Sequence, residues 1–320
     1  MKKGYLGIDV GSVSTNLIVI DENDEVLASL YLRTQGQPIR VIQEGMKEIS
    51  SLVPADVEIH AAGTTGSARY LGGIMVGADI IKNEITAHAI GTSRFVPGVQ
   101  TILEIGGQDS KIIILRDGIV TDFAMNTVCA AGTGSFLDQQ SARLCIPIED
   151  FGELALKSKN PVRIAGRCAV FAESDMIHKQ QLGHSMEDII AGLCDALVRN
   201  YLNNVGKGKE ILPPIAFQGG VAANAGMKKA FEKSLNHEVI IPKNFAVMGA
   251  LGVAIIAREA VQKKKETTFK GFEVTDFSYK TRSFECQSCP NRCEVVQFFQ
   301  NGEVIARWGS RCGKWDVQAS

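Results

Sequence analysis

Two copies of one pattern, three short apolar segments joined by two polar turns, constrain what this chain of 320 residues can fold into. Segments of this length, bounded by glycine or charged residues, predict an antiparallel meander. Gly11 lies in the first turn of the first copy, and Gly106 lies in the first turn of the second. The expected strands are residues 5–10, 15–20 and 26–32, then 101–105, 111–115 and 119–125. A chain that encodes one unit twice is expected to fold into two similar halves.

Segments with helical periodicity follow each meander, at residues 39–52 in the first half and 135–144 in the second. Strands followed by helices predict an α/β architecture, with a ligand cleft between the two halves. We expect a first domain at residues 1–95, completed by a long apolar helix at 245–262, and a second domain at residues 96–244.

The composition argues against several classes of protein. A net charge of -1 offers no basic excess for a nucleic-acid partner. No basic segment followed by an apolar stretch opens the sequence, and no run of about 18 apolar residues follows, so we expect neither export nor membrane insertion. The predicted compartment is the cytoplasm. Because thiols stay reduced there, the 8 cysteines are not expected to form structural disulfides.

The glycine turns predict phosphate binding, because glycine lets backbone N–H groups approach phosphate oxygens without an intervening Cβ. Asp9 precedes Gly11, and Asp109 follows Gly106 and Gly107. Both carboxylates are therefore candidates to hold a hydrated Mg²⁺ beside the phosphates. Either turn alone is more often an ordinary β-turn. The duplication favours the phosphate site.

Four motifs, in order, resemble those of the actin, hexokinase and Hsp70 ATPase superfamily. Gly7–Ser12 resembles the first phosphate motif, and Ile105–Ser110 resembles the second. Asn83–Gly91 resembles the first connecting helix, and Gly219–Val221 with Asn224 resembles the adenosine motif. The resemblance implies duplicated ribonuclease H-like domains that bind ATP in the cleft between them.

The same resemblance implies roles for individual residues. Asp9 and Asp109 would coordinate Mg²⁺ through water, Ser12 would contact phosphate, and Glu84 would lie near the attacking water. Gln108 occupies a position where Hsp70-type members have glycine, and its amide would orient water or the γ-phosphate. The remaining nucleotide contacts would come from Gly11, Val13, Gly106, Gly107, Gly132, Thr133, Gly134, Gly219, Gly220, Val221 and Asn224.

Two cysteines of the main body lie in glycine-containing loops. Cys129 precedes Gly132, and Cys168 lies in a Gly-Arg-Cys-Ala run. Two thiolates do not complete a four-ligand iron–sulfur cluster, but a two-fold dimer would bring two from each chain to its axis. A buried thiol fits each position about equally well. Cys145 and Cys194 are expected to be inert.

A closer resemblance bears on that choice. Asn126–Leu137 and Gly166–Asp175 resemble signatures of the ATP-dependent activators of 2-hydroxyacyl-CoA dehydratases, a group that includes the ATPase subunits of benzoyl-CoA reductases. The resemblance implies a homodimer with one 4Fe-4S cluster held by Cys129 and Cys168 of both chains. It also implies ATP hydrolysis with Mg²⁺, a ferredoxin or flavodoxin as electron donor, and the iron–sulfur cluster of a partner dehydratase or reductase as acceptor.

Residues 263–320 are expected to form a charged linker and a metal-binding tail. Three cysteines with Cys-x2-Cys-x3-Cys spacing precede an Asn-Gly hairpin and a fourth cysteine follows it, which is the general layout of a zinc ribbon. The predicted ligands are Cys286, Cys289, Cys293 and Cys312. Zinc and a second iron–sulfur cluster both fit this pattern.

Three alternatives to a dehydratase activator stay open at this point. The tail is absent from shorter activators and leaves room for another acceptor, such as a double-cubane iron–sulfur protein whose substrate is not an acyl-CoA. A small-molecule kinase of the same superfamily would need a carboxylate base for a hydroxyl group but no paired cysteines. A chaperone-like ATPase would need a larger C-terminal domain.

Overall fold

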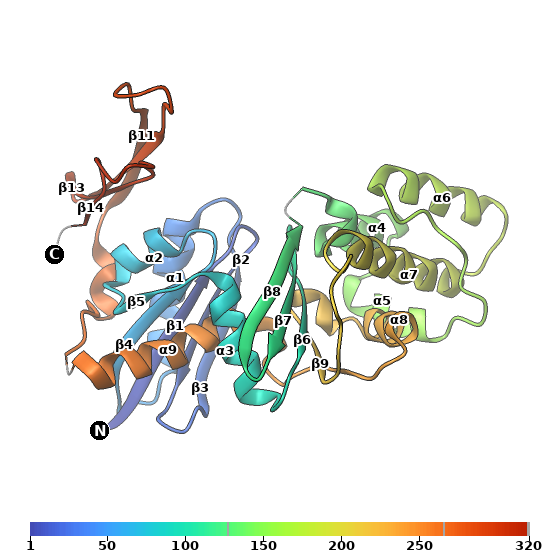
Figure 1. The fold of residues 1–320 in the computed structure, drawn as a ribbon, viewed down its shortest axis with the longest axis horizontal. Coiled ribbons are helices and arrows are strands. Elements are labelled where there is room, and N and C mark those ends of the chain that lie inside the picture. Colours follow the sequence, from blue (N-terminus) through green and yellow to red (C-terminus); the bar gives the residue numbers. More distant parts are fainter. Residues whose placement is uncertain (127, 265, 319–320) are drawn as a thin grey trace. The chain divides into compact units, whose positions relative to one another are not determined.

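Two five-stranded sheets organise the chain (Figure 1). The computed structural model describes residues 1–126, 128–264 and 266–318. Contacts divide the chain into a first unit, Met1–Asn83 with Val253–Ser320, and a second unit, Glu84–Gly252. The expected boundary lay at residue 95, whereas these contacts assign the helix α3 (Glu84–Phe95) to the second unit.

The first unit builds its sheet from residues near the start of the chain. Along the chain it contains β1 (Lys2–Val10), β2 (Ser14–Ile20), β3 (Val26–Arg33), α1 (Pro38–Leu52), β4 (Val57–Thr65), α2 (Arg69–Val76) and β5 (Ile80–Ile81). The strand order is β3-β2-β1-β4-β5, and β1 runs antiparallel to β2 and parallel to β4. Asp9 of β1 pairs with Thr65 of β4, so these two parallel strands end together.

The second unit repeats this arrangement. Its strands are β6 (Thr101–Ile105), β7 (Ser110–Arg116), β8 (Ile119–Asn126), β9 (Ile215–Gln218) and β10 (Val239–Ile240). Its helices after α3 are α4 (Gly134–Leu144), α5 (Ile148–Leu156), α6 (Ala169–Gln181), α7 (Met186–Asn204) and α8 (Ala225–Leu235). The strand order is β10-β9-β6-β7-β8, and β6 runs antiparallel to β7 and parallel to β9. The strands β6 to β10 therefore take the places that β1 to β5 take in the first sheet. The expected duplication is confirmed.

Burial along the strands follows their position in the sheets. Strands β1, β2, β6 and β7 consist almost entirely of buried residues, whereas exposed residues recur along β3 and β8. Continuous apolar runs suit strands that are covered on both faces, and exposed positions suit edge strands. β3 and β8 each form one edge of their sheet.

The long apolar helix is α9 (Met248–Lys264), preceded by the 3-10 turn η3 (Phe245–Val247). Among the described residues, Phe245–Gln262 is the one helical stretch long and apolar enough to cross a membrane by length and composition. Of that stretch, 56% is buried inside the structure. Arg258, near its end, forms an ion pair with the buried Asp24. These contacts are typical of a core helix of a globular protein.

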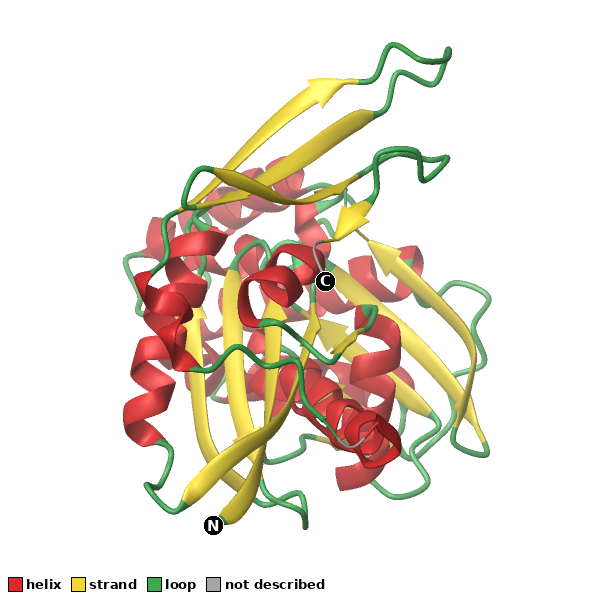
Figure 2. Cartoon of the chain, turned by 90° about the vertical axis from the view of Figure 1, so that its left-hand side faces the viewer, coloured by secondary structure: helices red, strands yellow, loops and turns green. Residues whose placement is uncertain are grey.

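The tail forms a small antiparallel sheet (Figure 2). After the 3-10 turn η4 (Phe272–Asp276) come β11 (Tyr279–Glu285), β12 (Glu294–Gln300), β13 (Glu303–Trp308) and β14 (Val317–Gln318), paired in that order. The expected Asn301–Gly302 hairpin joins β12 to β13. Gln43 of α1 donates hydrogen bonds to the carbonyl groups of Thr275 and Phe277, both at 3.0 Å, which fixes η4 on the first unit.

Candidate functional site

The first glycine turn joins β1 to β2. The Gly11 N–H donates to the Ser14 carbonyl at 2.9 Å, and a Cβ on Gly11 would lie 2.9 Å from that same oxygen. The Thr34 hydroxyl also donates to the Gly11 carbonyl at 2.9 Å and holds the turn. Ser12 is exposed and Val13 is half-buried. The turn thus has a tight backbone with a free hydroxyl side chain at its tip.

Asp9, at the end of β1, lies against a glycine that was not among the expected site residues. Gly66 has a φ of 95°, and a Cβ there would lie 2.6 Å from Asp9 Oδ1. Any other side chain at this position would clash with the Val10 carbonyl group as well as with the carboxylate, and would strain the backbone. The available signal was the Gly-Thr-Thr-Gly run at the end of a strand, because such runs mark turns.

Three hydrogen bonds join the second glycine turn to the start of α4, directly after the loop that carries Cys129. The Gly134 N–H donates to the Gly106 carbonyl at 2.8 Å. The Ser135 N–H and hydroxyl both donate to the Gly107 carbonyl, at 2.8 Å and 2.5 Å. Within the turn, the Gly106 N–H donates to the Asp109 carbonyl at 3.0 Å. These hydrogen bonds fix the turn against the start of α4, directly after the Cys129 loop.

A lysine absent from the expected site gathers three carboxylates in the second unit. Lys111 Nζ lies 2.9 Å from Glu84 Oε2, 3.1 Å from Glu104 Oε2 and 2.8 Å from Asp109 Oδ2. The Lys111 side chain is 3% exposed. The structure thus brings together two of the predicted catalytic residues, Glu84 and Asp109, around a buried ammonium group.

Burial and charge act against each other in this cluster. Burial alone would lower the pKa of Lys111, but the three carboxylates outweigh it and hold that pKa well above its ordinary value. Burial raises the pKa of Glu104 to about 8, although Lys111 opposes the shift. The cluster contains three acidic side chains and one basic side chain, so it suits a further cation better than an anion.

His88 belongs to a buried polar chain beside this cluster. Its Nδ1 lies 2.8 Å from Gln218 Nε2, and the Thr92 hydroxyl donates to Gln218 Oε1 at 2.6 Å. Burial lowers the pKa of His88 to about 3, so the ring is neutral. Gln218 ends β9, directly before Gly219. The chain therefore fixes where the third glycine turn begins.

The third glycine turn contains a 3-10 turn, η2 (Gly220–Ala223). Gly219 has a φ of 86°, and a Cβ there would lie 2.9 Å from Glu104 Oε1. Asn224 was expected to contact the nucleotide, and in the structure its side chain caps α8 by accepting from the Met227 N–H at 3.1 Å. Its amide nitrogen has no partner among the described atoms.

The second unit brings most of the predicted nucleotide contacts into one region. A Cβ on Gly134 would lie 3.1 Å from Val221 Cγ2 and 3.4 Å from Gly107 Cα, so the three glycine segments converge. Gln108 is exposed at the tip of its turn. Thr133 is buried, and its hydroxyl donates to the Ala130 carbonyl at 2.9 Å instead of facing outward.

The two body cysteines lie on neighbouring loops. Cys129 precedes the 3-10 turn η1 (Ala130–Gly132), and Cys168 is the N-cap residue of α6. Cys129 Sγ lies 4.0 Å from the Arg167 carbonyl oxygen, one residue before Cys168. Both thiols are half-buried. Two accessible cysteines on adjacent loops suit thiolate ligation of an iron–sulfur cluster.

Large apolar side chains surround these loops on the surface. Val128 is 94% exposed, Val170 69% and Phe171 67%. In contrast, burial raises the pKa of the Cys194 thiol to about 12, as expected for an inert core residue. Cys145 is exposed at the C-terminus of α4.

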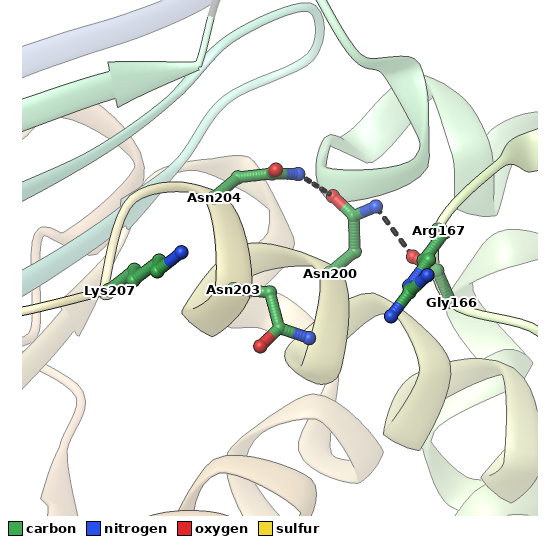
Figure 3. A pocket seen from close by; sticks show the side chains of 6 residues that line it. All are labelled: Gly166, Arg167, Asn200, Asn203, Asn204 and Lys207. Atoms are coloured by element: carbon green, nitrogen blue, oxygen red, sulfur yellow. Dashed lines mark hydrogen bonds between the residues drawn. The ribbon is translucent and has the colours of Figure 1, made fainter.

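A polar cavity of about 480 Å³ opens beside the Cys168 loop (Figure 3). One wall is the end of α7, and the other is the Gly166–Arg167 backbone. It is lined by Gly166, Arg167, Asn200, Asn203, Asn204 and Lys207. Figure 3 shows the Asn200 amide between Asn204 and Gly166, with a dashed hydrogen bond to each.

The predicted metal site of the tail is not confirmed. In the described ranges, 1–126, 128–264 and 266–318, no three His, Cys, Asp or Glu side chains are grouped as metal ligands. The two cysteine-bearing loops do meet, because Trp315 Nε1 donates to Cys286 Sγ at 3.2 Å and Lys314 Nζ donates to Ser288 Oγ at 2.7 Å. Sites that take two ligands per chain, as expected for Mg²⁺ and for a shared cluster, would form no such group.

The model of the BadF/BadG/BcrA/BcrD ATPase family matches residues 6–257, which includes all three glycine turns and both body cysteines. The chain belongs to this ATPase family. It is 37% identical over 266 residues to the (R)-2-hydroxyglutaryl-CoA dehydratase activating ATPase of Acidaminococcus fermentans, covering 81% of this chain and 98% of that one. It is 35% identical to the activator of lactoyl-CoA dehydratase of Anaerotignum propionicum, covering 81% and 99%.

Solved structures of activators share the fold of this family member. The activator of 2-hydroxyisocaproyl-CoA dehydratase from Clostridium difficile with bound ADPNP superposes with a TM-score of 0.72 at 29% identity, over 82% of this chain and 97% of that chain. Component A of the Acidaminococcus fermentans (R)-2-hydroxyglutaryl-CoA dehydratase superposes with a TM-score of 0.73 at 34% identity, over 81% and 99%. The family match ends at residue 257, before the tail.

Proposed function

We propose that this ATPase drives a low-potential electron from a ferredoxin or flavodoxin to the iron–sulfur cluster of a partner enzyme of the 2-hydroxyacyl-CoA dehydratase type. One observation carries the proposal: Gly134 and Ser135, the first residues of α4, hydrogen-bond to the second glycine turn, and the loop that leads into α4 carries Cys129. Nucleotide binding and cysteine geometry therefore share a few residues of backbone. Related proteins named as dehydratase activators support the choice of acceptor.

In this proposal a homodimer holds one 4Fe-4S cluster through Cys129 and Cys168 of each chain. When bound, the cluster supplies one-electron redox chemistry that side chains lack. The half-buried thiols on adjacent loops support this ligand set. The exposed Val128 and Phe171 beside them are apolar surface of the kind that a partner subunit covers.

In this proposal the glycine turns and the nearby acidic residues bind and hydrolyse ATP. We infer that Asp9 and Asp109 hold Mg²⁺ through water, while Ser12 and the backbone of the glycine turns bind phosphate. Glu84 would orient the attacking water, and Gln108 would contact the water or the γ-phosphate. The Lys111 ammonium group would hold Glu84 and Asp109 close together beside the cation.

The tail bears on which acceptor is used. It lies beyond the residues matched to the family and forms a separate sheet. A double-cubane iron–sulfur protein with a substrate other than an acyl-CoA is therefore the second candidate acceptor. Transfer of electrons to each purified acceptor, with and without residues 279–318, would discriminate between the two.

The proposal is tested by anaerobic purification and iron analysis of Cys129→Ala and Cys168→Ala. Each variant is expected to lose the 4Fe-4S absorption and its iron but to keep ATP binding, because neither thiol belongs to the glycine turns. Cys145→Ala, an exposed cysteine outside both loops, serves as the matched control and should keep the cluster. A full cluster in either of the first two variants after reconstitution contradicts the ligand assignment.

A further inference from the structure

Asn200, near the end of α7, touches both cysteine loops. Its Nδ2 donates to the Gly166 carbonyl at 2.5 Å and lies 3.7 Å from Cys129 Sγ. The two partners are far apart in the sequence, and Asn200 is 3% exposed. A single buried amide therefore ties the Cys129 loop to the Cys168 loop.

The orientation of this amide is determined by a neighbour. Asn204 Nδ2 donates to Asn200 Oδ1 at 2.8 Å, so the oxygen is engaged and the nitrogen faces Gly166 (Figure 3). The same nitrogen lies near the Cys129 sulfur. Amides that are satisfied on both sides do not flip without leaving a buried polar atom unpaired. The hydrogen bond from Asn204 thus fixes the orientation in which Asn200 Nδ2 faces Cys129 Sγ.

Asn200 also lies against the glycine loop that leads to the nucleotide turn. A Cβ on Gly132 would lie 2.6 Å from Asn200 Oδ1 and 3.1 Å from Asn126 Nδ2. Asn126 accepts from the Cys129 N–H at 2.9 Å and donates to the Cys129 carbonyl at 2.9 Å. Asn126 thus holds the backbone of Cys129, and Asn200 contacts its sulfur.

We propose that Asn200 is a positioning residue that sets the spacing of the two cysteine loops and tunes the reduction potential of the cluster they hold. The inference rests on the proposed function, because it requires a cluster ligated by Cys129. A hydrogen bond to a cluster sulfur stabilises the reduced form, which carries one more negative charge, and so raises the potential. Because Gly132 packs on the same amide, a shift of the glycine loop changes this hydrogen bond and with it the potential.

The test is a redox titration of the anaerobically purified full chain, followed by cluster absorption and electron paramagnetic resonance. Asn200→Ala is expected to lower the equilibrium constant for one-electron reduction by about tenfold, which is about 59 mV for a one-electron couple. Asn200→Asp, which replaces the donor by a negative charge, should lower the reduction potential further. Asn203→Ala is the matched control, since Asn203 lines the same cavity and is exposed.

If substitutions of Asn200 reduce the cluster content, a milder variant still allows the potential to be measured. Asn204→Ala removes an exposed side chain and leaves Asn200 free to turn its oxygen toward the sulfur. A smaller shift in the same direction is expected. Potentials equal to wild type in the Asn200 and Asn204 variants would overturn the inference. If Cys129→Ala retains the cluster, the proposed function fails first, so the two failures are distinguishable.

Discussion

Lys111 Nζ lies 2.8 Å from Asp109 Oδ2, so an ammonium group neutralises the carboxylate that we propose as a ligand of Mg²⁺. The same nitrogen lies 2.9 Å from Glu84 Oε2. One ammonium group thus holds Glu84 and Asp109 together. Entry of Mg²⁺ would exchange one positive partner of Asp109 for another.

Lys111→Met is expected to lower the free energy of unfolding of the metal-free chain by about 3–5 kcal/mol, because it leaves buried carboxylates without their counter-charge. Saturating MgATP should recover part of the loss, since the cation compensates the same acids. Denaturant unfolding with and without MgATP measures both effects. The control is Lys228→Met, whose pair with Glu232 is partly exposed, and for which a loss of about 0.3–0.5 kcal/mol is expected. Equal losses in the two variants would contradict the buried cluster.

Ser135→Ala is expected to weaken the link between nucleotide and cluster while ATP hydrolysis persists. The change removes the 2.5 Å hydrogen bond from the hydroxyl to Gly107 and keeps both backbone hydrogen bonds to the turn. The lost interaction is of the order of 1 kcal/mol. The measurement is the change in cluster absorption on addition of ATP. The control is Ser141→Ala, a change within α4 that removes a hydroxyl hydrogen bond to the Ile146 carbonyl beyond the helix, and it should leave the absorption change intact.

Gly66→Ala is expected to raise the KM for MgATP by tenfold or more, because the added Cβ would lie 2.6 Å from Asp9 Oδ1. A positive φ by itself costs an alanine about 1 kcal/mol or somewhat more. Gly36→Ala measures the effect of φ alone, since Gly36 has a φ of 69° but no atom within 4 Å of an added Cβ, whereas the Gly66 Cβ would also clash with the Val10 carbonyl oxygen. Steady-state ATPase kinetics of both variants give the two KM values for comparison. An unchanged KM in Gly66→Ala would place Asp9 outside the metal site.

His88 is expected to make the chain sensitive to acid. Its pKa is lowered from 6.5 to about 3 by burial, so below pH 6.5 the unfolded chain binds a proton that the folded chain does not. Stability is therefore complete above pH 6.5 and is lost as the pH falls toward 3, at up to about 1.4 kcal/mol per pH unit. In His88→Asn, whose amide can still meet Gln218, unfolding free energies measured between pH 7 and pH 4 should fall less steeply. Parallel pH profiles for the two proteins would refute this.

The sheets were predictable from the sequence because their signals are local. Continuous apolar runs at β1, β2, β6 and β7, each followed by a glycine or charged turn, define a strand from its immediate neighbours alone. The Gly106 turn and the Cys129 loop could be identified in the same way. The sequence could not reveal β11, whose residues after Tyr279 are mostly polar and exposed and which pairs only because β12 lies beside it.

The sequence by itself determined the duplicated α/β architecture, the positions of the glycine turns and the two cysteines of the body. Only the tertiary structure showed that Lys111 lies among Glu84, Glu104 and Asp109, and that Asn200, 71 residues from Cys129, reaches its sulfur. The physical reason is the separation in sequence over which each interaction acts. Turn and strand preferences depend on adjacent residues, whereas charge compensation and buried hydrogen bonds depend on which distant segments packing brings together.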